Sequence, residues 1–204
     1  SLVAGTVVGG KLLAAGGYTS GEIAQTETLD VGNGPPPPPP PPPHYVITTE
    51  TGQAIVPGTD DIGNHCDDCT TTFALPFPVR VYGHSYSTAT ASANGDLQFT
   101  TAVQGDYSNT CLPAADHGAM VAAYWDDLFT ANSGFGIYTA TTGTAPHRRF
   151  YVEWRAQYYP GDGNADFELV FDEDDAVIRS IYGNLTSGDS GSTEGVQDVD
   201  ESIL

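Results

Sequence analysis

Three cysteines and two nearby histidines are the residues whose types are most suited to metal binding or redox chemistry. Cys66 and Cys69 form a Cys-x-x-Cys pattern, Cys111 follows later, and His65 and His117 flank them in sequence. This set matches a Cys₃His zinc site, but a Cys-x-x-Cys pair without a second matching pair is a weak zinc signal. In an oxidising compartment we expect a disulfide from Cys111 to Cys69 or to Cys66, which leaves one thiol free or available for an intermolecular bridge. A tight Cys66–Cys69 bridge stays open as an alternative.

An acidic stretch near residue 162 is the next candidate for metal binding. Asp162, Asn164 and Asp166 alternate as the oxygen ligands of a calcium loop do, and Glu173 stands at the twelfth position. An EF-hand is excluded because its sixth position requires glycine and is Phe167 here. The remaining interpretations are a looser Ca²⁺ site in a sandwich loop, formed by Asp162, Asn164 and Asp166, and a plain polar turn.

Pairs of carboxylates could perform acid–base chemistry on a glycosidic bond. The available groups are Asp126-Asp127, Glu153 and Glu168. The two glutamates fall within regular strand patterns, with Arg155 two residues from Glu153, so cross-strand ion pairs account for them. The sequence contains neither a nucleophile-elbow motif nor a phosphate-binding glycine loop. We therefore predict that the protein is not an enzyme.

Candidate sites for sugars are few. Asn184-Leu185-Thr186 is a sequon for N-glycosylation, which makes Asn184 the candidate attachment residue. The adjacent tyrosines Tyr158-Tyr159 would suit stacking against a bound sugar, although aromatic residues in such a strand more often belong to the core.

Composition and charge exclude several classes of function. The chain has 204 residues with 26 acidic and 6 basic side chains, a net charge of −20. Binding to nucleic acid or to an anionic membrane surface is therefore not expected, and no apolar run is long enough for a membrane helix. The 24 glycines and 15 prolines favour short strands and turns over long helices.

The N-terminal segment Ser1–Gly34 is apolar and divided by glycine pairs. Its two apolar runs, Val3–Val8 and Leu12–Ala15, are separated by Gly9-Gly10, which predicts short strands. With Gly16-Gly17 followed by an aromatic residue, the segment resembles a single kelch-type repeat. A lone repeat cannot bury its own faces, so we expect its partner surface to lie outside the segment.

Pro35–Pro43 is an uninterrupted proline run. It predicts a polyproline II rod of about 28 Å, at roughly 3.1 Å per residue. We interpret it as a stiff spacer between the strand extension and a main domain at His44–Leu204.

The main domain shows the pattern of an all-β fold. In Arg148–Tyr158, apolar and polar residues alternate, and Asn94-Gly95 between two apolar runs is a strong hairpin signal. Many short strands at this spacing predict a β-sandwich of jelly-roll type. The expected strands are Tyr45–Thr49, Gln53–Val56, Thr71–Tyr82, Ser85–Ala93, Asp96–Thr101, Ala119–Trp125, Phe135–Ala140, Arg148–Tyr158, Ala165–Asp172, Ala176–Tyr182 and Thr193–Gln197.

An ordered set of short phrases spans most of this domain. In chain order they are Asp67-Asp68-Cys69-Thr70, Ala74-Leu75-Pro76-Phe77-Pro78, Ser92-Ala93-Asn94-Gly95-Asp96, Tyr124-Trp125-Asp126-Asp127-Leu128, Val152-Glu153-Trp154-Arg155 and Gly195-Val196-Gln197. Together they resemble a β-sandwich module of large bacterial surface proteins and, more distantly, the extracellular nidogen-like domain. The resemblance implies an extracellular adhesion or structural role, and it implies no catalytic residues.

These features predict a structural subunit of an extracellular filament or surface array, in a homopolymer of identical copies. N-terminal strands of one copy would insert into a neighbour, a heterologous contact that grows head to tail. The alternative is a secreted adhesin that binds glycans, with Ca²⁺ as an optional cofactor. The residues expected at the assembly interface are Leu2, Val3, Val7, Val8, Leu12 and Leu13.

Overall fold

The computed structural model describes residues 4–8, 11–15, 27–30, 45–187 and 191–199. Strands and turns make up this described part of the chain, and it includes no helix. The chain divides into two compact units, Ser1–Pro41 and Pro42–Leu204. The predicted polyproline rod lies outside the described residues.

The N-terminal unit contains a three-stranded antiparallel sheet in the order β1-β2-β3. Its strands are β1 (Ala4–Val8), β2 (Lys11–Ala15) and β3 (Glu27–Asp30). The register aligns Val7 with Leu12 and Leu12 with Leu29, so apolar residues form one row across all three strands. Of the predicted interface residues, Val7, Val8, Leu12 and Leu13 belong to β1 and β2, whereas Leu2 and Val3 lie outside the described residues.

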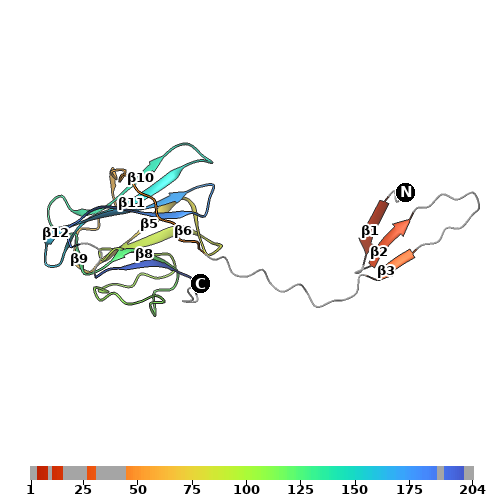
Figure 1. Ribbon diagram of the computed structural model, residues 1–204, viewed down its shortest axis with the longest axis horizontal. Coiled ribbons are helices and arrows are strands. Elements are labelled where there is room, and N and C mark those ends of the chain that lie inside the picture. The colour runs from red at the N-terminus through yellow and green to blue at the C-terminus, as the bar shows by residue number, and fades with distance from the viewer. Residues whose placement is uncertain (1–3, 9–10, 16–26, 31–44, 188–190, 200–204) are drawn as a thin grey trace, which may run out of the picture. The chain divides into compact units, whose positions relative to one another are not determined.

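The second unit is a sandwich of two antiparallel sheets, as the alternating pattern predicted, and Figure 1 shows the two layers stacked. The six-stranded sheet has the order β13-β12-β11-β10-β4, with β9 pairing to β11, and the five-stranded sheet has the order β14-β8-β7-β6-β5. Most neighbours are consecutive strands joined by short turns. The bounds are β4 Asp60–Asp61, β5 Thr70–Val81, β6 His84–Ser92, β7 Asp96–Gln98, β8 Met120–Trp125, β9 Leu128–Phe129, β10 Gly136–Thr142, β11 Arg149–Tyr158, β12 Asp162–Asp172, β13 Ile178–Leu185 and β14 Thr193–Gln197.

The main core lies between the two sheets. On β11 the inward face is the one that the sequence predicted, and Trp154 is fully buried and stacks on Phe167 of β12 with ring centroids 5.2 Å apart. Tyr124 of β8 reaches the same cluster from the opposite sheet, 5.4 Å from Phe167. Burial of side chains of this size supplies most of the stabilising free energy of such a domain.

The Asn94-Gly95 hairpin between β6 and β7 is confirmed. Gly95 has φ +88°, and a Cβ at this position would lie 2.0 Å from the carbonyl oxygen of Tyr124, so both the conformation and the close approach require glycine. The Asn94 side chain accepts a hydrogen bond from the Leu128 amide at 2.9 Å. The turn is therefore also a junction between the two sheets.

A long connection, residues 99–119, covers the outer face of the five-stranded sheet. The buried Gln197 side chain accepts a hydrogen bond from the Ala114 amide at 2.7 Å and donates to the carbonyls of Ala114 and Gly118. Trp125 donates its indole N–H to the Asp106 carbonyl at 2.8 Å. These side chains replace water as partners of the connection's backbone, which allows it to lie flat on the sheet.

Candidate functional site

The outer face of the six-stranded sheet is crossed by Ile55–Thr59, which we call the strap. Val56 donates its amide hydrogen to both carboxylate oxygens of Glu168 at 3.2 Å, and Gly58 donates to Glu153 at 2.7 Å. Glu153 is 4% exposed and Glu168 is fully buried. The strap therefore covers both glutamates on the face of the sheet that lies away from the main core.

Close packing holds the strap against four successive strands. A Cβ at Gly183 of β13 would lie 2.7 Å from the Ile55 side chain, and a Cβ at Gly58 would lie 2.5 Å from Cβ of Tyr138. The strap continues into β4 through the hydrogen bond from the Thr59 amide to the Thr139 carbonyl at 2.9 Å. The predicted strands Tyr45–Thr49 and Gln53–Val56 are wrong, because neither segment pairs with a strand among the described residues. Tyr45 packs against Tyr82, and the Val56 amide bonds to the Glu168 side chain.

The two carboxylates that bind the strap, Glu153 and Glu168, differ in their electrostatics. Glu153 forms an ion pair with Arg155, whose Nη2 lies 2.6 Å from Oε2, and Arg155 also donates to the Gly58 carbonyl at 2.9 Å. Burial raises the pKa of Glu168 from 4.5 to about 7, with smaller contributions from the charges of Glu153 and Asp166, and the Val56 amide opposes the shift. The predicted cross-strand ion pairs are wrong, because Arg155 pairs with Glu153 within β11, and the residue opposite Glu153 on β12 is the like-charged Glu168.

A polar groove of about 280 Å³ lies beside these carboxylates. Both Asn164 and Asp166, predicted as calcium ligands, line the groove together with Asn184, the predicted glycosylation residue. Oδ1 of Asp166 is buried and receives no hydrogen bond from any described residue. The full lining is Gly134, Phe135, Glu153, Arg155, Ala156, Asn164, Asp166 and Asn184.

The groove is positioned by an irregularity in strand pairing. The register between β12 and β13 shifts between Ala165 and Phe167, so Asp166 lies at a bulge opposite Gly183 and Asn184. Burial raises the pKa of Asp166, the charge of Glu153 raises it further, and Arg155 counteracts both. The groove thus combines carboxylates, amides and a guanidinium, a donor and acceptor set that suits hydroxyl groups.

The structure places Asp162, Asn164 and Asp166 in β12 and not in a loop. At two-residue spacing along a strand, their Cα atoms are separated by roughly 6.6 Å per step, whereas Ca²⁺ ligands converge at about 2.3–2.6 Å. Asp162 does not line the groove. The predicted calcium site at these three residues stays a prediction, and the strand geometry gives it no preformed shape.

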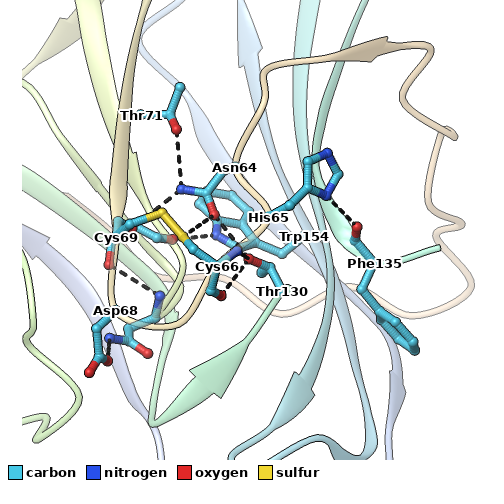
Figure 2. Close-up of a disulfide and its surroundings, with 11 residues drawn as sticks. Asn64, His65, Cys66, Asp68, Cys69, Thr71, Thr130, Phe135 and Trp154 are labelled. Carbon is cyan, nitrogen blue, oxygen red and sulfur yellow. Dashed lines mark hydrogen bonds between the residues drawn. A yellow bond between two sulfur atoms is a disulfide. The ribbon is translucent and has the colours of Figure 1, made fainter. Parts of the chain in front are cut away.

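The disulfide joins Cys66 to Cys69 (Figure 2). Cys111 is an exposed free thiol. The preferred prediction of a bridge to Cys111 is therefore wrong. The two bonded cysteines belong to one tight loop, with Cα atoms 6.0 Å apart, whereas Cys111 belongs to the connection over the five-stranded sheet. Asp68 within the loop has φ +57°. Spacing in sequence could not distinguish these pairings.

Hydrogen bonds fix the disulfide loop against both sheets. Figure 2 shows Asn64 reaching the Cys69 carbonyl, at 3.3 Å, and Thr130 accepting from the Cys66 amide, at 3.0 Å. His65 instead contacts the Phe135 carbonyl at 2.8 Å. The Cys₃His zinc interpretation is wrong, because two of its thiols are oxidised and this histidine is occupied elsewhere.

Three carboxylates beside the disulfide form a cluster that the sequence did not reveal. Asp67, Asp68 and Asp127 place ligand oxygens within 4.8 Å of one another, a geometry that suits a divalent cation. Burial, and then the neighbouring carboxylates, raise the pKa of Asp67 and of Asp127. The acidic pairs are visible in the sequence, but nothing in it indicates that Asp127 approaches the disulfide loop.

Comparison with known families identifies the sandwich. The family described as NIDO related matches residues 44–204. No curated protein and no solved structure gives a significant match. None of the described segments forms a helix with the length and apolar character needed to cross a bilayer. Since the family match covers more than half of the chain, and the nidogen-like resemblance pointed the same way, the chain belongs to the NIDO-related family, whose domains are β-rich and typically extracellular.

Proposed function

We propose that the chain is a structural subunit of an extracellular filament or array on a bacterial surface, which assembles head to tail through its N-terminal strands. The observation on which this rests is the small size of the N-terminal unit: three strands of five, five and four residues. Sheets this small are stable only when a face packs against something else. The kelch-like pattern, a repeat that depends on neighbours, agrees with this need.

The energetics are adequate for a stable contact. Burial of Leu2, Val3, Val7, Val8, Leu12 and Leu13 contributes roughly 1.5–3 kcal/mol for each side chain. Association costs about 4–15 kcal/mol in lost freedom of motion. The sum favours binding when most of the six side chains are covered, which requires contacts on both faces of the small sheet because successive side chains alternate. Backbone hydrogen bonds at a sheet edge contribute further.

The strap supports a mechanical role for the link between the units. Tyr45, the first described residue after the proline run, packs edge-on against Tyr82 with ring centroids 4.9 Å apart. Further along the chain, the amides of Val56 and Gly58 bond to Glu168 and Glu153. Tension on the linker would therefore reach the sandwich through several buried contacts. The same contacts occupy Glu153 and Glu168, the best-placed carboxylate pair, which supports a non-catalytic role.

Removal of Ser1–Gly34 tests this function. We expect the shortened chain to remain folded and to become monomeric, because the sandwich keeps its core, strap and disulfide. Light scattering and negative-stain images would report assembly, with the full chain at the same concentration as the control. Thermal unfolding would verify the fold. Polymers that persist in the shortened chain would rule out assembly through the N-terminal strands.

A glycan-binding adhesin is the second candidate function, and the groove favours it. Its unpaired Asp166 oxygen and its two asparagines would accept and donate hydrogen bonds to sugar hydroxyls. We expect the Asp166→Asn chain to lose at least tenfold in affinity on a glycan array relative to wild type, with Asp162→Asn as the matched control outside the groove. Absence of any glycan binding by the wild-type chain, with or without Ca²⁺, would reject this function.

A further inference from the structure

Sheet edges in the sandwich differ in how they are protected against pairing with another chain. β5, at one edge of the five-stranded sheet, has Pro76 and Pro78, which lack amide hydrogens, and its register is irregular between Ala74 and Val79. β10 is partly covered by β4, whose Asp60 and Asp61 add exposed charges. Prolines, bulges and edge charges are the features that prevent edge-to-edge association.

The other two edges are β14 and β13. β14 is five residues long and its pairing is interrupted between Thr193 and Gly195. β13 is eight residues long and lacks both proline and acidic residues. Arg179, its one charged residue, forms an ion pair with Asp172 of β12. Among the described residues β13 pairs with β12 alone. Its pairing is irregular only at Gly183-Asn184, so Ile178–Tyr182 is an edge segment in regular register without proline or acidic residues.

Apolar surface is exposed along this same edge. Tyr182 is 43% exposed although its hydroxyl reaches across the sandwich to the Ala123 carbonyl at 3.0 Å, and Val177 is 39% exposed. Ile178 and Leu185 pack on the main core and are only partly buried. The core is therefore incompletely closed beside β13, and an added strand would cover its rim.

A strand suited to this edge exists in the N-terminal unit. β1 and β3 are the outer strands of its sheet. β3 includes Glu27 and Asp30, whereas β1 has no charged residue, and the first acidic residue of the chain is Glu22. Copies with a net charge of −20 repel one another, so contacts between acid-free strands face the smallest penalty.

We propose that the edge of β13 is the acceptor in the assembly, and that β1 of a second copy pairs alongside it. The pairing joins the three-stranded sheet of one copy to the six-stranded sheet of the next and closes the core rim at Tyr182. This inference rests on the proposed function and specifies which of the four edges receives the strand.

Matched lysine substitutions in the full chain test the acceptor edge. Ser180 of β13 and Ala74 of β5 are both exposed, and Ser180→Lys and Ala74→Lys add the same charge to different edges. We expect S180K to raise the critical concentration for assembly at least tenfold and A74K to leave it within twofold of wild type. Equal effects of the two variants, or normal assembly of S180K, would overturn the proposal. Equal unfolding temperatures would verify that both variants fold.

Cross-linking between copies separates failure of the acceptor from failure of the function. One full chain has Thr6→Cys in β1, another has Ser180→Cys in β13, and both have Cys111→Ser to remove the free thiol. A bifunctional maleimide should link the two chains only in the mixture. Polymers without this link would overturn the β13 acceptor while assembly through the N-terminal strands stands. Polymers that survive deletion of Ser1–Gly34 would overturn both.

Discussion

The sandwich and the N-terminal unit differ in how they cover their own surfaces. The sandwich covers both outer faces with connecting segments, the strap on one sheet and residues 99–119 on the other, and holds each with buried polar side chains. The described residues of the N-terminal unit are three short strands, and no covering segment occurs among them. The sandwich therefore covers its own faces, and the proposed function assigns the covering of the N-terminal sheet to a second copy of the chain.

The two coverings of the sandwich also differ in chemistry. Residues 99–119 are held by the neutral amide of Gln197, whereas the strap is held by the carboxylates of Glu153 and Glu168. A neutral amide bonds equally at all physiological pH values. A buried carboxylate titrates, so the strap contacts of Glu153 and Glu168 respond to pH in a way that the Gln197 contacts do not.

The largest expected effect is that of Gln197→Leu. The substitution leaves the Ala114 amide and the carbonyls of Ala114 and Gly118 buried without their partner. Since each unsatisfied buried group costs about 1–3 kcal/mol, we expect a loss of about 3 kcal/mol or more in the free energy of unfolding. Urea titration would measure it, with the exposed Gln53→Leu as the control. A loss below about 1 kcal/mol would show that the covering does not depend on this side chain.

Reduction of the disulfide should lower the free energy of unfolding by less than Gln197→Leu does. Cys66 and Cys69 are separated by three positions in sequence, and closing so short a loop stabilises the native state by about 2 kcal/mol. A bridge from Cys66 to Cys111 would close a far longer loop and contribute about 4 kcal/mol. Unfolding of the Cys66→Ser/Cys69→Ser chain distinguishes the two values. Peptide mapping without reductant provides a direct control of the pairing.

The free energy of unfolding should also depend on pH. The folded-state pKa of Glu168 is about 7 against an unfolded 4.5, so folding favours the protonated form. The stabilisation that Glu168 contributes is complete below the pKa of the unfolded chain, 4.5, and is lost as the pH rises through 7. Asp96, whose pKa burial raises to about 6, acts in the same direction. We expect the free energy of unfolding to fall as the pH rises from 5 to 8.

Glu168→Gln isolates the strap's share of this pH dependence. The amide oxygen still accepts from Val56, and the variant should be more stable than wild type at pH 8 and less sensitive to pH. Glu173→Gln is the matched control, because Arg148 lowers the pKa of Glu173 and its titration falls at more acidic pH. If the free energy of unfolding of Glu168→Gln depended on pH as strongly as that of wild type, the contact between Glu168 and the strap would not be a source of the pH dependence.

Local patterns predicted much of the sandwich. Alternation along Arg148–Tyr158 predicted β11 with its buried face, and Asn94-Gly95 predicted the β6–β7 turn. These predictions succeeded because period-two burial and turn chemistry depend on neighbouring residues.

Contacts between distant segments could not be predicted in the same way. Gly58 and Glu153 are 95 positions apart, and no local pattern indicates that a strap covers the glutamate. Apolar character alone made residues 45–56 resemble strands. The groove at Asp166 depends on a bulge between β12 and β13, and the pairing of Cys66 depends on the shape of one loop.

Hydrogen exchange at the amides of residues 4–15 tests the central claim most directly. We expect the amides of β1 and β2 to exchange rapidly in dilute, monomeric full-length chain and to become protected when the chain assembles. Sandwich amides such as those of β11 should stay protected in both conditions and serve as the internal reference. Equal protection of residues 4–15 in the monomer would contradict the account, because the N-terminal strands would then be stable without a second copy.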